Sequence, residues 1–221
     1  VAMIDMTVLL PSNVKGTHMS RFLEVLQNHH DPLSLASVKT MMVTMLNRLE
    51  AEEGHIDLRM PLFLKKVAPV SGVESLLDYD LHIKAAYKDG NLKYTLQVQV
   101  PVTSLCPCSK KISEYGAHNQ RSHIVIAAEL IEDMAAEDLI KIAEQAASCE
   151  LWGLLKRPDE KYVTERAYDN PKFVEDLVRD IAVALEQERK VIAYEVSSEN
   201  FESIHNHSAY AWLSNDKRNR H

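Results

Sequence analysis

Hydrophobic residues recur at every second position in several stretches of the chain, which is the period of a β-strand with one buried face. The first stretch, residues 2–10, places Ile4, Met6 and Val8 on one side. Asp89 followed by Gly90 gives a tight-turn signal between two later stretches. The strands predicted in this way span residues 2–10, 56–62, 76–87, 92–100, 122–132, 190–198 and 208–214.

Apolar residues at three- and four-residue spacing predict helices between these strands. The first predicted helix is short and begins at Ser20. The other three cover residues 37–51, 136–155 and 171–188. Pro158 is expected to end the third helix, because proline does not continue a helix. Asn170 and Pro171 are expected to be the N-cap and the first residue of the fourth.

The order of these elements suggests an internal repeat. The second half reads strand-strand-helix-helix-strand-strand, and the first half reads the same without its opening strand. We therefore expect an α+β fold of two tandem modules, each an antiparallel sheet with two helices on one face. The modules would cover residues 1–90 and 91–221, and the first module's opening strand would lie upstream of Val1.

Composition narrows the class of protein. The chain has 221 residues, 46% of them hydrophobic, which is enough for a substantial core. A formal net charge of −7 argues against a general nucleic-acid binder, since phosphate neutralisation needs a basic excess. No apolar run approaches the roughly 18–20 residues that span a bilayer, and the start lacks a secretory signal profile. Three cysteines make no disulfide framework, so we expect a reducing, cytoplasmic location.

The densest polar run is the loop predicted between the strands at 92–100 and 122–132. Cys106 and Cys108 flank a proline there, and Lys110 and Lys111 follow at once. Nearby cations favour the thiolate, which attacks carbon or binds a metal. One intervening residue is too few for a zinc knuckle, so the two thiols are expected to have separate roles, with His118 as a second available metal ligand. The alternative is two small buried residues in a loop and a surface histidine.

Other polar residues have a structural and a functional interpretation. Cys149 falls on the apolar stripe of a predicted helix and is interpreted as a core residue. Glu160 lies in a charge run that is typical of a solvated face, whereas a half-buried Glu175 could accept two N–H groups from a planar heterocycle or simply be solvated. His205 and His207 would share a face in an extended turn, with Glu202 close by.

Six segments carry a resemblance to a known family. They cover residues 15–22, 68–72, 101–109, 115–122, 154–160 and 199–207, and they closely resemble the prokaryotic GTP cyclohydrolase of type IB. The resemblance runs over essentially the whole chain. It implies two tunnelling-fold modules per chain, assembled as a homotetramer with sites at subunit interfaces.

The resemblance also implies residue roles. Cys106, His118 and Glu160 match the ligands of a divalent metal, zinc or manganese, and no organic cofactor is expected. Cys108 matches the essential catalytic thiol, and Glu175 matches the carboxylate that anchors the guanine ring. The remaining matches line the pocket and are Glu202, His205 and His207. Lys111 stands where the family has an acidic residue, which alters the local charge.

These residue types suit the implied reaction, in which GTP is hydrolysed at C8 to give formate and 7,8-dihydroneopterin triphosphate. A metal can lower the pKa of bound water from about 15.7 to about 7. His205 or His207 could act as general acid–base, and Cys108 as nucleophile or proton carrier. The candidate contacts for the triphosphate are His18, Arg21, Lys65, Lys66, Lys110, Lys111 and Arg121.

Two rival functions remain at this point. One is a related tunnelling-fold enzyme that uses a cysteine nucleophile on a purine-like nitrile, which would consume a nicotinamide cofactor and need no metal. The other is a non-catalytic module that binds a nucleotide or a metal.

For the leading interpretation, GTP is the expected substrate, and no nucleic acid or membrane partner is expected. The product would feed folate or modified-tRNA synthesis.

Overall fold

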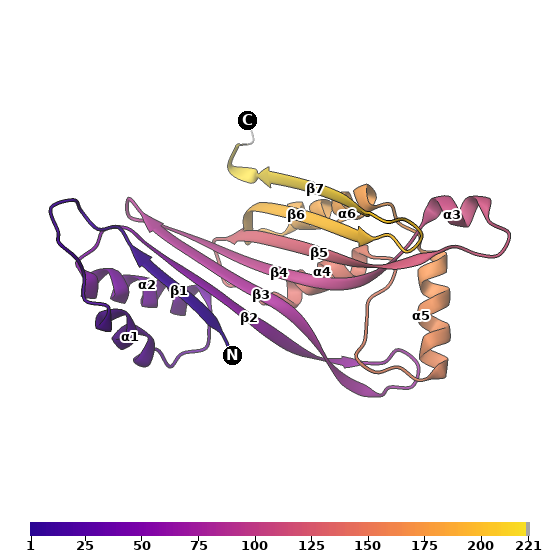
Figure 1. The fold of residues 1–221 in the computed structure, drawn as a ribbon, viewed down its shortest axis with the longest axis horizontal. Helices are drawn as coiled ribbons and strands as arrows, with labels where there is room; N and C mark the ends of the chain where they lie inside the picture. The colour runs from indigo at the N-terminus through magenta and orange to yellow at the C-terminus, as the bar shows by residue number, and fades with distance from the viewer. Residues whose placement is uncertain (220–221) are drawn as a thin grey trace.

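The alternating segments of the chain pair into one antiparallel sheet. The computed structural model describes residues 1–219, and within them seven strands lie side by side in sequence order. They are β1 (Met3–Val8), β2 (Gly54–Val67), β3 (Glu74–Lys88), β4 (Asn91–Leu105), β5 (Asn119–Leu130), β6 (Val191–Phe201) and β7 (Ser208–Asp216). Figure 1 shows them as a twisted sheet with β1 and β7 at the two edges.

Helices cover one face of this sheet. The helices of the first half are α1 (Ser20–Gln27) and α2 (Leu35–Leu49), and those of the second are α3 (Pro107–Ile112), α4 (Ala136–Ala146), α5 (Arg157–Asp169) and α6 (Val174–Gln187). Ile83 pairs with Leu96, which pairs with Ala128, and all three are buried in the same core as residues of α2, α4 and α6. Directly paired residues point to the same face of a sheet. Helix α2 of the first half and helices α4 and α6 of the second therefore pack on one face, and the fold is α+β as expected.

The two halves meet in the β3–β4 hairpin. Asp89 and Gly90 both have positive φ, 49° and 79°, as a tight hairpin turn requires. Hydrogen bonding continues across this hairpin, from Lys88 opposite Asn91 to Asp80 opposite Gln99. The predicted junction near residue 90 is thus a turn within a continuous sheet.

The third predicted helix is wrong beyond its first eleven residues. Helix α4 ends at Ala146, and the chain then runs extended, so that Cys149 exchanges backbone hydrogen bonds with Thr103. Cys149 is fully buried, so its interpretation as a core residue is confirmed although it lies outside the helix. Apolar spacing alone could not locate the end, because residues 147–149 remain buried in the extended chain as well.

The sequence prediction missed α5 entirely. Pro158 occupies the second position of this helix, where its missing N–H has no intrahelical partner to lose, so it begins a helix instead of ending one. Asn170 is correspondingly the C-cap of α5 and donates a side-chain hydrogen bond to the Ala147 carbonyl. The last helix, α6, begins at Val174 and not at Pro171.

Candidate functional site

Backbone pairing at the end of the sheet brings Cys106 and His118 together. The backbone N–H of Cys106 donates to the His118 carbonyl at 3.2 Å, directly beyond the last β4–β5 pair, Leu105 opposite Asn119. Cys106 is half-buried, whereas Cys108 is exposed on the short helix α3 that connects the two strands. The separation of roles predicted for the two thiols thus has a structural counterpart in their different exposure.

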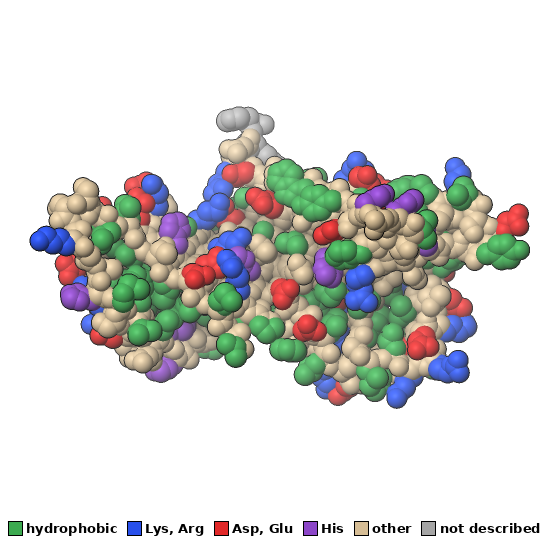
Figure 2. Space-filling model, viewed as in Figure 1, with side chains coloured by type: hydrophobic (Ala, Val, Ile, Leu, Met, Phe, Trp, Pro, Cys, Tyr) green, Lys and Arg blue, Asp and Glu red, His purple; other side chains and the backbone are tan. Residues whose placement is uncertain are grey.

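The loop between β6 and β7 lies against this pair. The Ser203 Oγ is 3.0 Å from His118 Nδ1, and the side-chain amide of Gln120 donates to Glu202 Oε1 at 2.9 Å. His205 and His207 follow, with their rings stacked at 5.1 Å and 13° between planes. Both are exposed, and Figure 2 shows histidine side chains gathered over this end of the molecule. Glu202, His205 and His207 therefore lie at the same end of the sheet as Cys106 and His118.

Glu160 and Glu175 lie elsewhere within one chain. Glu160 is exposed in the first turn of α5, while the other end of that helix contacts α3 through Tyr168, whose carbonyl accepts from Lys110 Nζ. The sequence separation of eight between Glu160 and Tyr168 corresponds to about 12 Å along a helix. Glu175 is exposed in the first turn of α6, not half-buried as one interpretation required.

The donor atoms at the Cys106–His118 pair suit a metal such as zinc. Sulfur, imidazole nitrogen and carboxylate oxygen are the usual ligands of zinc in proteins. In residues 1–219, no three His, Cys, Asp or Glu side chains are grouped closely enough to hold one ion. Two of the three predicted ligands are thus brought together, and Glu160 stays a predicted third ligand.

Most of the predicted phosphate contacts already have partners in the chain. Lys66 Nζ lies 2.8 Å from both carboxylate oxygens of Glu144, and Lys65 pairs with Glu74 at 2.6 Å. Lys110 also lies over the Tyr168 ring.

The other four predicted phosphate contacts are spread over the molecule. Arg21 lies in α1 and donates to the Arg48 carbonyl, and His18 precedes that helix, at the opposite end of the molecule from α3 (Figure 1). Lys111 and Arg121 are exposed near the cysteines.

Burial sets the protonation of several groups outside this cluster. Burial raises the pKa of the Cys149 thiol to about 11, so this thiol stays neutral, as a core residue should. Burial also opposes ionisation of Asp159, but hydrogen bonds from Ser71, Lys156 and Val70 outweigh it and hold the pKa of this carboxyl well below its usual range. Asp159 is therefore an ionised, fully buried carboxylate directly beside Glu160.

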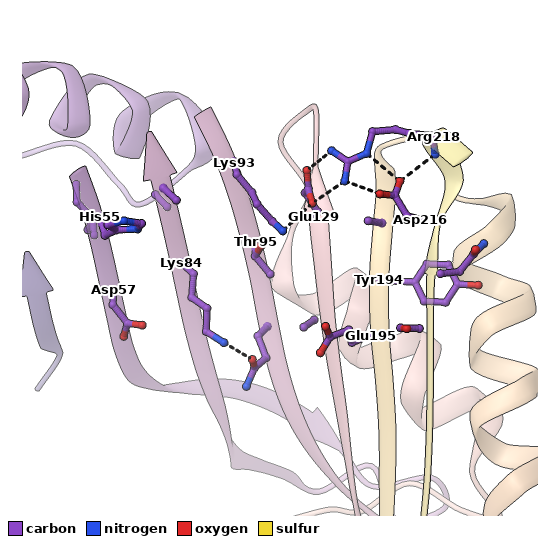
Figure 3. A pocket seen from close by; sticks show the side chains of 18 residues that line it. His55, Asp57, Lys84, Lys93, Thr95, Glu129, Tyr194, Glu195, Asp216 and Arg218 are labelled. Carbon is purple, nitrogen blue, oxygen red and sulfur yellow. Dashed lines mark hydrogen bonds and ion pairs between the residues drawn. The ribbon is translucent and has the colours of Figure 1, made fainter. Parts of the chain in front are cut away.

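A concave region lies on the open face of the sheet, at the end of the strands opposite the cysteines. This hollow has a volume of about 570 Å³ and is lined by charged side chains from β2 to β7 (Figure 3). Arg218 bridges Glu129 at 2.7 Å and Asp216 at 2.8 Å, and Lys93 approaches Glu129 at 3.3 Å. Its most prominent charges thus compensate one another within the chain.

Comparison with known proteins identifies the family. A family profile described as "Type I GTP cyclohydrolase folE2" matches residues 1–211. The chain belongs to this family. It is 60% identical over 216 residues to the GTP cyclohydrolase FolE2 of Paraburkholderia phymatum, covering 98% of this chain and 81% of that protein. It is likewise 60% identical over 219 residues to GTP cyclohydrolase FolE2 2 of Dechloromonas aromatica, with 99% and 81% covered.

Solved structures support the fold at much lower sequence identity. A uricase from Arthrobacter globiformis superposes with a TM-score of 0.57 at 7% identity, over 99% of this chain and 86% of that one. A Bacillus fastidious uricase gives 0.56 at 10% identity, over 91% and 74%. At such identity the similarity shows the fold alone, and the tunnelling fold expected from the sequence is confirmed. No helix in the described part of this FolE2-family chain is long and apolar enough to cross a membrane.

Sequence reasoning missed the polar residues beneath the cysteines. Ser122 Oγ lies 2.7 Å from both Ser104 Oγ and Asn200 Oδ1, which ties β4, β5 and β6 together directly under the site. These three residues and Gln120 are buried on the helix-covered face. Only Ser122 falls within a predicted strand, and the other three lie where the observed strands extend beyond the predicted ranges.

Proposed function

We propose that this FolE2-family chain is a GTP cyclohydrolase that hydrolyses GTP at C8 of the imidazole ring. The products would be formate and 7,8-dihydroneopterin triphosphate, a precursor for folate or deazaguanine-tRNA synthesis. The observation that carries the proposal is the pairing of Cys106 with His118, with Cys108 exposed two residues further on. The 60% identity to proteins named GTP cyclohydrolase FolE2 over nearly the whole chain supports it.

Cys106, His118 and Glu160 would hold a divalent metal, zinc or manganese. Such a metal, when bound, supplies a water whose pKa is lowered to about 7, which provides hydroxide at neutral pH. The role of the chain is to fix Cys106 and His118 through the β4–β5 pairing and to orient the His118 ring beside Ser203. Glu160 is exposed in a single chain and therefore accessible to a second copy.

The remaining residues would handle the substrate and the protons. Cys108 would act on the opened ring, as nucleophile or proton carrier, because its thiol is exposed next to the pair. His205 and His207 would give and take protons during ring opening and closing. Glu175 would accept two N–H groups of guanine, and Glu202 would line the pocket.

The assembly and the phosphate contacts complete the proposal. We propose a cytoplasmic homotetramer, in which Glu160 and Glu175 of one copy lie near the cysteines of another, because both carboxylates are exposed in the isolated chain. Lys111 in α3 and Arg121 in β5 are exposed cations and would contact the triphosphate. His18, Arg21, Lys65, Lys66 and Lys110 stay predicted contacts.

One assay tests the activity. Protein loaded with zinc or manganese is incubated with GTP, and formate and oxidised pterin fluorescence are both measured. We expect both products in equal amounts, and neither product with any metal would overturn the proposal. Consumption of a nicotinamide cofactor after exhaustive chelation would instead favour the nitrile-reducing alternative, and GTP binding without products would favour a binding module.

A further inference from the structure

The far ends of β2 and β3 form a hairpin arm, residues 65–76, that packs against the segment between α4 and α5. The indole N–H of Trp152 donates to the Val67 carbonyl at 2.9 Å. A Cβ at Gly153 would lie 2.4 Å from the Leu76 carbonyl oxygen, so only glycine allows this approach of the two backbones. In Figure 1 the tip of the arm meets the beginning of α5.

Asp159 connects the arm to α5 through hydrogen bonds from Val70 and Ser71. Its Oδ1 accepts from the backbone N–H groups of Val70 and Ser71 at 2.9 and 2.8 Å. Its Oδ2 accepts from the Ser71 hydroxyl at 2.6 Å and from the Lys156 backbone N–H at 2.8 Å. The side chain is fully buried, so all of its hydrogen-bonding capacity is used to join the arm tip to the first turn of the helix.

The other end of α5 is attached to the cysteine-bearing end of the sheet. The backbone N–H of Lys172 donates to the Leu105 carbonyl, one residue before Cys106, and Lys110 of α3 donates to the Tyr168 carbonyl. Helix α5 is therefore held at both ends, by Asp159 at the arm and by these contacts near the cysteines. Glu160 directly follows Asp159, so its direction depends on how the first turn is fixed.

We propose that Asp159 is a positioning residue that sets the orientation of Glu160 for the proposed cyclohydrolase reaction. The inference rests on the proposed function, because Glu160 is the predicted carboxylate ligand of the metal. Asp159 acts through the backbone of the first helical turn. It is buried and pointed at the arm, so it does not contact substrate or metal itself.

The main test is Asp159→Asn, which keeps the shape of the side chain but turns one acceptor into an N–H donor facing other donors. Residues that orient a ligand typically change metal affinity or activity about 10–100-fold when replaced. We expect kcat and zinc affinity, the latter from chelator competition, to fall by about that factor, with KM for GTP changed less than about twofold.

Tyr79→Phe is the matched control. The Tyr79 hydroxyl donates to Glu144 Oε1 at 2.7 Å, a buried contact between β3 and α4 that does not involve α5. This variant should lower the melting temperature while keeping kcat and zinc affinity within about twofold of the parent protein. All assays are run well below the melting temperature of every variant.

A second pair of variants changes Ser71, the hydrogen-bond partner of Asp159, and tests whether a smaller change gives a smaller loss of zinc affinity. Ser71→Ala removes one of the four hydrogen bonds to Asp159, and Ser71→Thr keeps the hydroxyl. We expect an intermediate loss of zinc affinity for Ser71→Ala and recovery in Ser71→Thr. Since Ser71 is exposed on the arm, neither change disturbs a packed core.

The outcomes separate this inference from the proposed function. Unchanged kcat and zinc affinity in Asp159→Asn would overturn it, as would an equal loss in Tyr79→Phe at an equal fall in melting temperature. Glu160→Gln sets the loss expected when the ligand itself is removed, and unchanged zinc affinity there would overturn the inference too. If the parent protein shows no GTP turnover, the proposed function fails, and the zinc titrations still decide the role of Asp159.

Discussion

Two polar regions of this chain differ in whether their side chains are buried and hydrogen-bonded within the chain or exposed. At the arm, Asp159 is fully buried and receives four hydrogen bonds from its own chain. At the cysteine end, Cys108 on the short helix α3 and His205 and His207 on the β6–β7 loop are exposed, and the sheet carries both segments. Polar groups satisfied internally fix the frame, whereas exposed groups on a fixed frame are free to contact a ligand or a second copy.

The largest expected effect separates the two thiols. Cys108→Ser should lower kcat by about 10²–10⁴-fold, the range for a residue that transfers protons or attacks substrate, while zinc content stays unchanged. Cys106→Ser should lose the zinc as well as the turnover, because a hydroxyl is a poor zinc ligand. Metal analysis of the purified variants beside the formate assay measures both quantities.

One result would reverse the roles assigned to the half-buried Cys106 and the exposed Cys108. If Cys108→Ser loses zinc and Cys106→Ser keeps it, the assignment of the two cysteines is reversed. Cys149→Ala is the control, since this thiol is fully buried and is held neutral by a raised pKa. It should keep both zinc and turnover, measured below its own melting temperature.

The next largest effect distinguishes two adjacent lysines of the arm. The Lys66 side chain is 14% exposed and pairs with Glu144, whereas the Lys65 side chain is 60% exposed. Lys66→Met leaves a buried carboxylate without its cation and should lower the free energy of unfolding by about 3–5 kcal/mol. Lys65→Met should change it by less than about 1 kcal/mol.

Urea unfolding measures this difference, and GTP kinetics measure a second one. Because Lys66 is engaged inside the chain, its replacement should alter stability much more than KM for GTP. A large rise in KM with unchanged stability would instead support the predicted contact between Lys66 and the triphosphate.

The sheet and the cysteine loop could be predicted from local patterns. Alternation over residues 92–100 and 122–132 located β4 and β5, and the loop between two rigid strands was therefore placed at the end of the sheet. The hairpin at Asp89 was equally local, because its turn needs only two residues with positive φ. Such features depend on neighbours in sequence, which a single sequence displays.

The anchored region could not be predicted in the same way. Pro158 is compatible with the end or the start of a helix, and the choice depends on Asp159 finding partners almost ninety residues away at Val70 and Ser71. Likewise Glu202 gains its partner Gln120 only when β6 pairs with β5. Contacts of this range are set by tertiary structure and leave no period in the sequence.

A glycine tests how closely the arm must approach the segment between α4 and α5. Gly153→Ala would place a Cβ 2.4 Å from the Leu76 carbonyl, so the backbones must separate, at a cost of about 1–3 kcal/mol in the free energy of unfolding. Gly16→Ala is the control, since no atom lies within 4 Å of a Cβ there. Equal stability of both variants would show that the arm tolerates displacement. The arm would then be less firmly fixed than its comparison with the exposed cysteine end requires.

The smallest expected effect concerns an exposed pair on the same helix as Asp159. Lys161 Nζ lies 2.9 Å from Glu165, with side chains 74% and 60% exposed. The lysine precedes the glutamate and lies near the positive end of the helix dipole, which is the weaker arrangement. Lys161→Met should therefore change the free energy of unfolding by less than about 0.5 kcal/mol, and less still in about 0.5 M salt. A double-mutant cycle with Glu165→Gln measures the coupling. A coupling above about 1 kcal/mol would mean that the solvated face of α5 also holds the helix in place, and the contrast with its anchored first turn would fail.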